Sequence, residues 1–242
     1  MSGLINGVIV SVTFRATMGR RRALLFAVPG VVLIAVAALL AATASGGSWR
    51  PEFLSDFGFT IVLPLTSLII GTSVLGAEID DGSVVHLLAT PVPRSQVVLS
   101  KFLVAATLTI LFGAIPEYLG ASIAAGPGSR LAIGLLAGAL AASVIYNALF
   151  VMLSVLTTRA IAIGLLYLLV WEGLLANLVP GVGLLSASQY SLSIANSIAT
   201  NKALRAHLTL TTAVVMALIV TVAALVICTR KLSAFSIRGD AA

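Results

Sequence analysis

Charged residues are scarce in this sequence. Asp, Glu, Lys and Arg make up 9% of its 242 residues, against about 25% in ordinary globular proteins. Hydrophobic residues make up 60% of the chain, and its mean hydropathy is +1.15. Because so few charges cannot cover a surface that faces water, the composition excludes a soluble domain and predicts a polytopic membrane protein.

Residues for metal and catalytic chemistry are also few. The single cysteine, Cys228, cannot form an intramolecular disulfide, and the two histidines, His86 and His207, lie far apart without a second histidine or a thiol nearby. The sequence contains no Gly-x-Ser-x-Gly elbow and no His-Glu-x-x-His pair, so we expect neither an enzyme nor a metal site. A Gly-x-x-x-x-Gly-Lys-Ser/Thr phosphate loop is absent as well, so no nucleotide cofactor is expected on this chain.

The basic residues point to membrane orientation. Fourteen Lys and Arg against eight Asp and Glu give a net charge of +6. The basic residues stand in short clusters beside apolar runs, which fits a membrane boundary better than a nucleic-acid groove, so no nucleic-acid partner is expected.

Six apolar runs are each long enough to cross a hydrocarbon core, which takes about 20 helical residues. A backbone in lipid must satisfy its own hydrogen bonds, and no repeated alternation of period two favours a barrel, so we predict an all-α fold. The chain is expected to form one transmembrane domain over 1–242. Its predicted spans are 23–44, 57–77, 97–119, 131–156, 160–180 and 208–229.

The positive-inside rule orients these spans with both termini in the cytoplasm. In that orientation four basic residues lie outside: Arg50, Arg130, Lys202 and Arg205. The other ten lie inside: Arg15, Arg20, Arg21, Arg22, Arg94, Lys101, Arg159, Arg230, Lys231 and Arg238.

The N-terminal region predicts a short helix along the inner membrane surface. Residues 3–15 place an apolar stripe on one helical side. The first apolar run follows three arginines and ends in small residues, as a signal peptide does, but its length favours an uncleaved span. The stripe consists of Leu4, Ile5, Val8, Ile9 and Val12.

The predicted cytoplasmic stretch 78–101 reads as one short helix, a Pro-x-Pro elbow and a new helix start. Asp81 or Ser83 is suited to cap the short helix, and Pro91 and Pro93 end it. From these residues alone, a helix that inserts into a partner's groove and a solvated connector remain equally open.

This stretch resembles the loop between the second and third spans of ABC-2-type transporter permeases, the membrane subunits of ATP-driven exporters. The segment 170–175, followed by Pro180-Gly181 and Gln189-Tyr190, is similar to the fifth span and outer loop of one branch of that family. The residues that match the loop pattern are Glu78, Gly82, Ser83, Leu87, Leu88, Pro91, Arg94 and Lys101.

The resemblance implies a permease that forms the translocation pathway as a dimer in the cell membrane. It implies that the 78–101 loop, with Asp81 among its residues, carries a coupling helix that docks on a separate ATPase subunit. ATP and Mg would then bind to that subunit, and the second permease chain would be identical or similar. It also implies a short re-entrant or outer helix within the exterior stretch 181–207.

Three polar residues are expected inside the bilayer, where a charge costs about 2.5–3.5 kcal/mol and must face protein or water. Glu172 is expected either to line a cavity or to pair with Asn147 or Tyr146. Asn147 is expected to hold helices together, with a role in the pathway as the alternative. Glu117 is expected either to accompany a kink at Pro116 or to mark the outer interface.

Two other function classes remain open from the sequence. A carrier driven by an ion gradient usually needs intramembrane charges and broken helices in repeated halves, and no halves are evident here. A membrane assembly subunit without transport activity is the third class. Transport by the chain alone would favour the carrier, and co-purification with a nucleotide-binding subunit would favour the permease.

Overall fold

The computed structural model describes every residue of the chain except 1–6, 44–48, 81–91, 177–181 and 239–242. The described residues form helices joined by short turns, with no strand among them. The helices are α1 (Gly7–Thr17), α2 (Arg20–Thr43), α3 (Trp49–Phe53), η1 (Leu54–Val62), α4 (Leu63–Asp80), α6 (Arg94–Thr109), η2 (Ile110–Ala114), α7 (Ile115–Ala125), α8 (Arg130–Leu156), α9 (Ala160–Leu166), η3 (Tyr167–Leu175), η4 (Val182–Leu185), α11 (Ala187–Ala199), η5 (Lys202–Leu204) and α12 (Leu210–Arg238).

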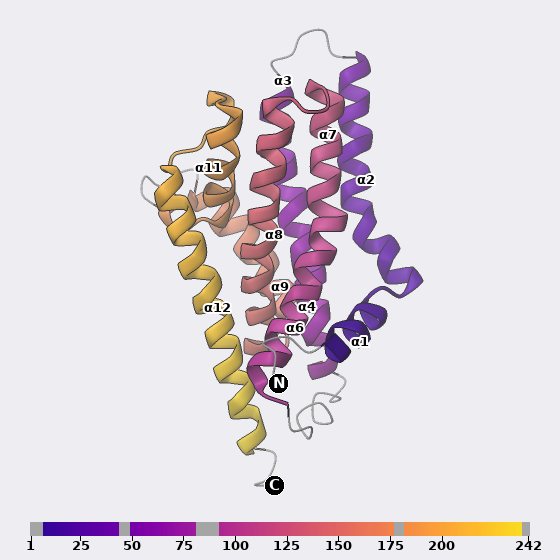
Figure 1. Ribbon diagram of the computed structural model, residues 1–242, viewed down its shortest axis with the longest axis vertical. Helices are drawn as coiled ribbons and strands as arrows, with labels where there is room; N and C mark the ends of the chain where they lie inside the picture. The colour runs from indigo at the N-terminus through magenta and orange to yellow at the C-terminus, as the bar shows by residue number, and fades with distance from the viewer. Residues whose placement is uncertain (1–6, 44–48, 81–91, 177–181, 239–242) are drawn as a thin grey trace.

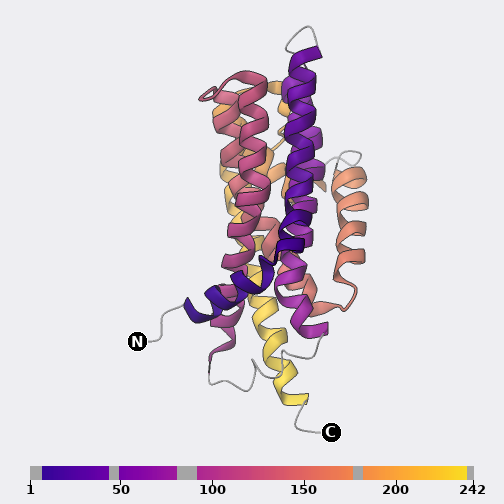
Figure 2. The ribbon, with the colours of Figure 1, turned by 90° about the vertical axis from the view of Figure 1, so that its right-hand side faces the viewer.

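The long helices run side by side along the long axis of the molecule (Figure 1). α8 lies at the centre, where it packs against α4, α11 and α12. α1 crosses the lower end of the bundle at an angle to the other helices (Figures 1 and 2). The start of α1, the end of α12 and the two helix ends that flank 81–91 all lie at this lower end.

Five helices among the described residues are long and apolar enough to cross a membrane. They coincide with the first, second, third, fourth and sixth predicted spans. The fifth predicted span, 160–180, contains the shorter apolar helix Ala160–Leu174, so a sixth span stays a prediction. The five helices are Arg22–Thr43, Pro51–Gly76, Arg94–Ala125, Arg130–Leu156 and Leu210–Ala234.

The turn between α7 and α8 follows from its sequence. Gly126 and Gly128 have φ values of +92° and +76°, which a residue with a Cβ rarely adopts. Ser129 then caps α8, because its hydroxyl accepts a hydrogen bond from the Ala132 N–H at 3.2 Å. The Gly-Pro-Gly segment therefore ends one long helix and positions the next one antiparallel beside it.

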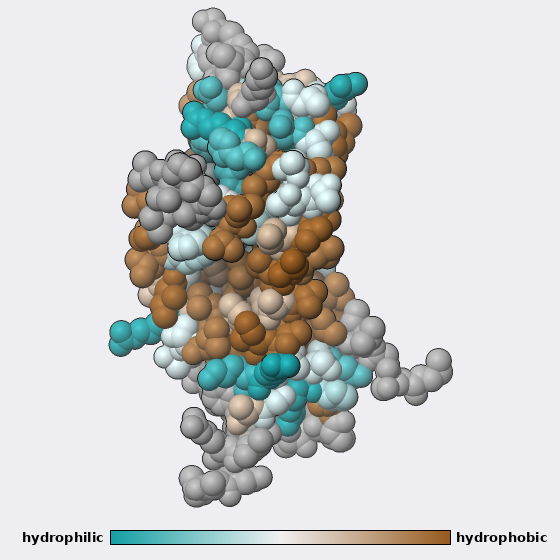
Figure 3. Space-filling model, turned by 90° about the vertical axis from the view of Figure 1, so that its left-hand side faces the viewer, coloured by the Kyte–Doolittle hydropathy of each residue, from teal (hydrophilic) through white to brown (hydrophobic). Residues whose placement is uncertain are grey.

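On the face seen in Figure 3, a broad hydrophobic belt lies between hydrophilic residues towards the two ends. Leucine and valine side chains of α2 and α12 are also largely exposed, including Leu39 at 61% and Leu218 at 60%. Apolar side chains this exposed on long helices are expected to face lipid. The molecule is therefore a membrane-embedded helical bundle.

The N-terminal helix is present, and Val8 and Val12 of its predicted apolar stripe do not lie on the side that packs on the bundle. Val8 and Val12 are 72% and 62% exposed, whereas Thr13 and Thr17 are buried. α1 turns this threonine side toward the bundle because it packs on α6 and α4. The exposed valines leave an apolar side that fits the predicted position on a membrane surface.

Candidate functional site

Glu172 is a buried carboxylate in η3, a π-helical segment at the edge of the bundle (Figure 2). π-Helical turns are rare and occur often at functional sites, because the extra residue in the turn changes the direction of the side chains that follow. The Glu172 side chain is 1% exposed. A buried carboxylate needs donors, and the fold supplies them from a distant part of the chain.

At least five groups among the described residues donate hydrogen bonds to the Glu172 carboxylate. The Tyr167 hydroxyl and the Ala187 N–H reach Oε1, each at 2.8 Å. The Ser186 and Ser188 hydroxyls reach Oε2 at 2.6 and 2.7 Å. The Ser188 N–H reaches Oε2 at 3.4 Å. All five groups are donors, which is the set that an acceptor-only carboxylate takes.

These donors lie at the N-terminus of α11. Ser186 is the N-cap of that helix and accepts a hydrogen bond from the Gln189 N–H at 3.3 Å. A helix N-terminus has unpaired N–H groups and a partial positive charge, so a carboxylate stabilises it. Glu172 therefore joins the end of η3 to the start of α11 across a segment of the chain outside the described residues.

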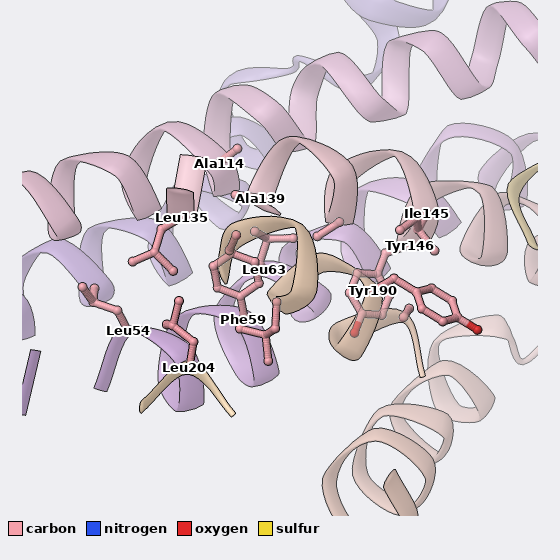
Figure 4. Packing of buried hydrophobic residues seen from close by; sticks show 14 of the residues in the cluster. Leu54, Phe59, Leu63, Ala114, Leu135, Ala139, Ile145, Tyr146, Tyr190 and Leu204 are labelled. Carbon is pink, nitrogen blue, oxygen red and sulfur yellow. The ribbon is translucent and has the colours of Figure 1, made fainter. Parts of the chain in front are cut away.

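α11 is buried in the bundle, where it packs against two glycines of α8. A Cβ atom at Gly138 would lie 2.6 Å from the Ser191 carbonyl oxygen, and one at Gly134 would lie 2.6 Å from the Ala195 carbonyl oxygen. Glycines four residues apart let two helix backbones approach this closely. Residues 186–193 are all buried, and Tyr190 packs in the same cluster as Tyr146 of α8 (Figure 4). The 181–207 stretch thus holds a buried helix, as the sequence predicted a short helix there.

Asn147 joins three helices at the centre of the bundle. Its Nδ2 donates to the Thr109 hydroxyl of α6 at 2.8 Å and to the Ser143 carbonyl at 2.7 Å. A Cβ at Gly71 of α4 would lie 3.1 Å from its Oδ1, so α4 passes close by. The Ser143 bond lies within α8, whereas the Thr109 bond links α8 to α6 and fits the expected role in holding helices together. The hydrogen bonds described above for Glu172 come from Tyr167 and the start of α11, and the Tyr146 hydroxyl has no hydrogen-bond partner among the described residues, so the pairing of Glu172 with Asn147 or Tyr146 stays a prediction.

Glu117 is fully buried in α7, directly after Pro116. Its carboxylate packs against η1, where a Cβ at Gly58 would clash with it, so it faces protein. It has no hydrogen-bond partner among the described residues. The π-helical η2 ends at Ala114, shortly before Pro116, which lacks an N–H for the regular helical ladder. A kink at Pro116 and a position at the outer interface both stay predictions.

We expect the variant Glu117→Met to be more stable than the natural protein. An unpaired buried carboxyl group costs about 1–3 kcal/mol, and methionine has a similar length without that cost. The thermal midpoint of the detergent-solubilised protein measures the effect. The control Glu52→Met, on an exposed side chain of α3, should change stability by less than about 0.5 kcal/mol. A destabilised Glu117→Met would mean that the carboxylate has a partner outside the described residues.

The residues predicted for ATPase coupling are divided between described and undescribed parts of the chain. Glu78 lies in the last turn of α4, and Arg94 begins α6. Lys101 is fully buried rather than in the loop, and its Nζ donates to the Val74 carbonyl at 3.1 Å. This contact ties α6 to α4 above the loop. The remaining predicted residues lie outside the described part: Asp81, Gly82, Ser83, Leu87, Leu88 and Pro91.

Sequence reasoning missed the residues that seat α11. Gly134 and Gly138 form a Gly-x-x-x-Gly pattern within an apolar run, which typically marks close helix packing. Ser186 and Ser188 precede and open a helix, as capping residues do. Both patterns are visible in the sequence. The glycine pattern does not predict which helix packs on it, and the serine pattern does not predict which carboxylate it contacts.

The fold defines an integral membrane protein built as a helical bundle. A family model described as an ABC-2 family transporter protein matches residues 18–179. This match covers about two thirds of the chain, and the protein therefore belongs to the ABC-2 transporter family, as the loop pattern predicted. It runs from the start of α2 to just past η3 and ends before α11. No curated protein matches the chain.

Proposed function

We propose that this chain is the membrane-spanning permease subunit of an ATP-driven exporter in the cell membrane. The family match, which includes the whole 78–101 loop, is the observation that carries the proposal. The chain has six spans with Ala160–Leu174 inside the fifth, and its termini and the loop face the cytoplasm. The lower end of the bundle, where the loop joins α4 and α6, is then the cytoplasmic end.

A separate ABC ATPase supplies the energy. The sequence lacks a phosphate-binding loop, so ATP and Mg bind to that partner rather than to this chain. The partner docks on the coupling helix within 78–101. Force on this helix reaches α4 and α6 together, because the buried Lys101 holds α6 to the Val74 carbonyl of α4.

From these two helices the movement passes to the centre of the bundle. Asn147 of α8 is hydrogen-bonded to Thr109 at the end of α6, and Gly71 of α4 lies against it. α11 packs closely against α8 at Gly134 and Gly138. A push on the loop would therefore tilt α4, α6 and α8 together and move α11 with them, which opens and closes the outer half of the pathway.

The pathway forms between this chain and a second, identical or similar chain. The α9 and η3 helices lie at the edge of the bundle beside α4 (Figure 2). Their outward side carries Ile163, Leu166 and Val170, which are 43%, 60% and 40% exposed. In a membrane an apolar side of this kind faces either lipid or another apolar helix, and in this proposal it packs against the second chain.

Replacing Leu87 and Leu88 with aspartate tests the coupling role. We expect the variant to insert normally but to lose transport and co-purification of the ATPase, because charges in the coupling helix oppose its burial in an apolar groove. The matched control Leu87→Ile/Leu88→Ile keeps the apolar surface and should retain both. Normal ATPase binding and transport in the aspartate variant would exclude the docking role.

The two buried carboxylates, Glu117 and Glu172, favour a carrier driven by an ion gradient as the second candidate. The purified chain in lipid vesicles distinguishes the two functions. Transport that follows an imposed ion gradient without any ATPase would support the carrier. Transport only with the ATPase and ATP would support the permease.

A further inference from the structure

A cavity of about 630 Å³ opens at the lower end of the bundle, between α2, α4 and the junction of α8 with α9. Its volume lies within the range of about 300–1,000 Å³ that is typical of small-molecule sites. No function described above uses it. Its walls are formed by Arg22, Leu25 and Phe26 of α2, Ile69, Thr72, Ser73 and Gly76 of α4, and Ser154, 157–162 and Leu165 of α8, α9 and the turn between them.

Two arginines from different helices supply the charge of this cavity. Arg22 stands in the first turn of α2 and Arg159 at the start of α9, and both side chains are exposed. Neither has an acidic partner among the described residues. The Thr157 hydroxyl, which accepts the Arg159 N–H at 3.1 Å, keeps its own hydrogen available beside Arg159. Two guanidinium groups with a neighbouring hydroxyl form a donor set that suits a phosphate group.

The walls of the cavity are effectively apolar despite their hydroxyls. Thr72, Ser73 and Ser154 donate to the Leu68, Ile70 and Val151 carbonyls of their own helices, at 2.7, 2.8 and 2.8 Å. Hydroxyls engaged in this way do not donate to a ligand in the cavity. The remaining lining includes Phe26, Ile69 and Leu165. Its chemistry is therefore cationic at the arginines and hydrocarbon-like elsewhere.

The position of the cavity agrees with this separation of two arginines from an apolar lining. Arg22 begins the apolar helix Arg22–Thr43, and Arg159 follows the end of Arg130–Leu156, so both residues stand at the ends of the apolar helices. The apolar lining continues from there along the helices. A ligand in this cavity would have its charge at the membrane boundary and its apolar part at the depth of the lipid tails.

We propose that this cavity binds an anionic phospholipid from the membrane leaflet at this end of the bundle. The phosphodiester lies between Arg22 and Arg159, and an acyl chain lies along Phe26, Ile69 and Leu165. Basic pockets between transmembrane helices bind anionic headgroups in this way. The bound lipid joins α2 to α9.

Binding of fluorescent phosphatidylglycerol to the full-length chain in detergent micelles tests the proposal, with fluorescent phosphatidylcholine as the neutral probe. We expect phosphatidylglycerol to bind at least about tenfold more tightly. The variant Arg22→Gln/Arg159→Gln should lose this preference. The matched control Arg15→Gln/Lys231→Gln removes two exposed charges at the same end that do not line the cavity, and it should stay within about twofold of the natural protein.

Two further measurements separate a lipid from other occupants. Ala162→Trp fills the cavity and keeps both arginines, so it should also abolish phosphatidylglycerol binding. Inorganic phosphate at millimolar concentration should not displace the lipid. Displacement by phosphate, unchanged binding in Ala162→Trp, or equal loss in the Arg15/Lys231 control would overturn the proposal. One further result would overturn the proposal. The natural protein would bind neither lipid, its measured mass would be that of a dimer, and this dimer would dissociate in the Arg22→Gln/Arg159→Gln variant.

Discussion

Replacing Glu172 with alanine is expected to destabilise the protein by about 3 kcal/mol or more and to release the start of α11. The substitution removes the acceptor of the Ala187 N–H and of the hydroxyls of Tyr167, Ser186 and Ser188. The two serine hydroxyls lie 2.9 Å apart, so one of them can donate to the other, and each buried donor left unsatisfied costs about 1–3 kcal/mol. It also removes the negative charge from the N-terminus of the helix. The thermal midpoint measures the loss, and hydrogen exchange at the Ala187 amide measures the release.

Two control variants isolate the role of this carboxylate. Glu52→Ala removes an exposed carboxylate of α3 and should leave both measurements nearly unchanged. Glu172→Gln keeps the volume but replaces one acceptor oxygen with a donor group, so it should fall between the natural protein and Glu172→Ala. If Ala187 exchanges at the natural rate in Glu172→Ala, the carboxylate does not hold α11.

Replacing Gly138 with alanine is expected to be the second most damaging change. The new methyl group would lie 2.6 Å from the Ser191 carbonyl oxygen and 2.8 Å from the Ala195 Cβ, so α8 and α11 must separate. Overpacking of this kind costs about 1–3 kcal/mol. The thermal midpoint should fall by roughly 2–4 °C per kcal/mol, and transport should fall with it if α11 closes the pathway.

Gly120 provides the matched control for this substitution. It is buried in α7, but a Cβ there would meet its nearest neighbour, Leu54 Cδ2, at an ordinary 3.6 Å. Gly120→Ala should therefore be neutral or slightly stabilising, because alanine favours a helix by about 0.5–1 kcal/mol over glycine. If the thermal midpoint falls equally in Gly138→Ala and Gly120→Ala, the bundle does not tolerate added volume in general, and the close packing of α11 on α8 is not the cause.

The fifth predicted span, 160–180, shows a limit of sequence reasoning in its hydrogen-bond register. The apolar helix among its described residues is Ala160–Leu174, and 177–180 lie outside the described residues. Its second half is π-helical, a change of hydrogen-bond register that depends on neighbouring helices and leaves no mark in residue composition. Lys101 shows the same limit. Its charge suggested a place in the water-exposed loop, but the long side chain reaches a carbonyl of α4 inside the bundle.

The sequence by itself determined that this protein lies in a membrane as a helical bundle, where its long spans run, and to which family its loop belongs. These features follow from composition and local order, because hydrocarbon requires apolar helices of a minimum length. Only the tertiary structure decided that Glu172 meets the start of α11, that Gly134 and Gly138 seat this helix, and that Arg22 and Arg159 share one cavity. Each of these contacts joins residues from different helices, and their meeting depends on how the helices pack rather than on their order along the chain.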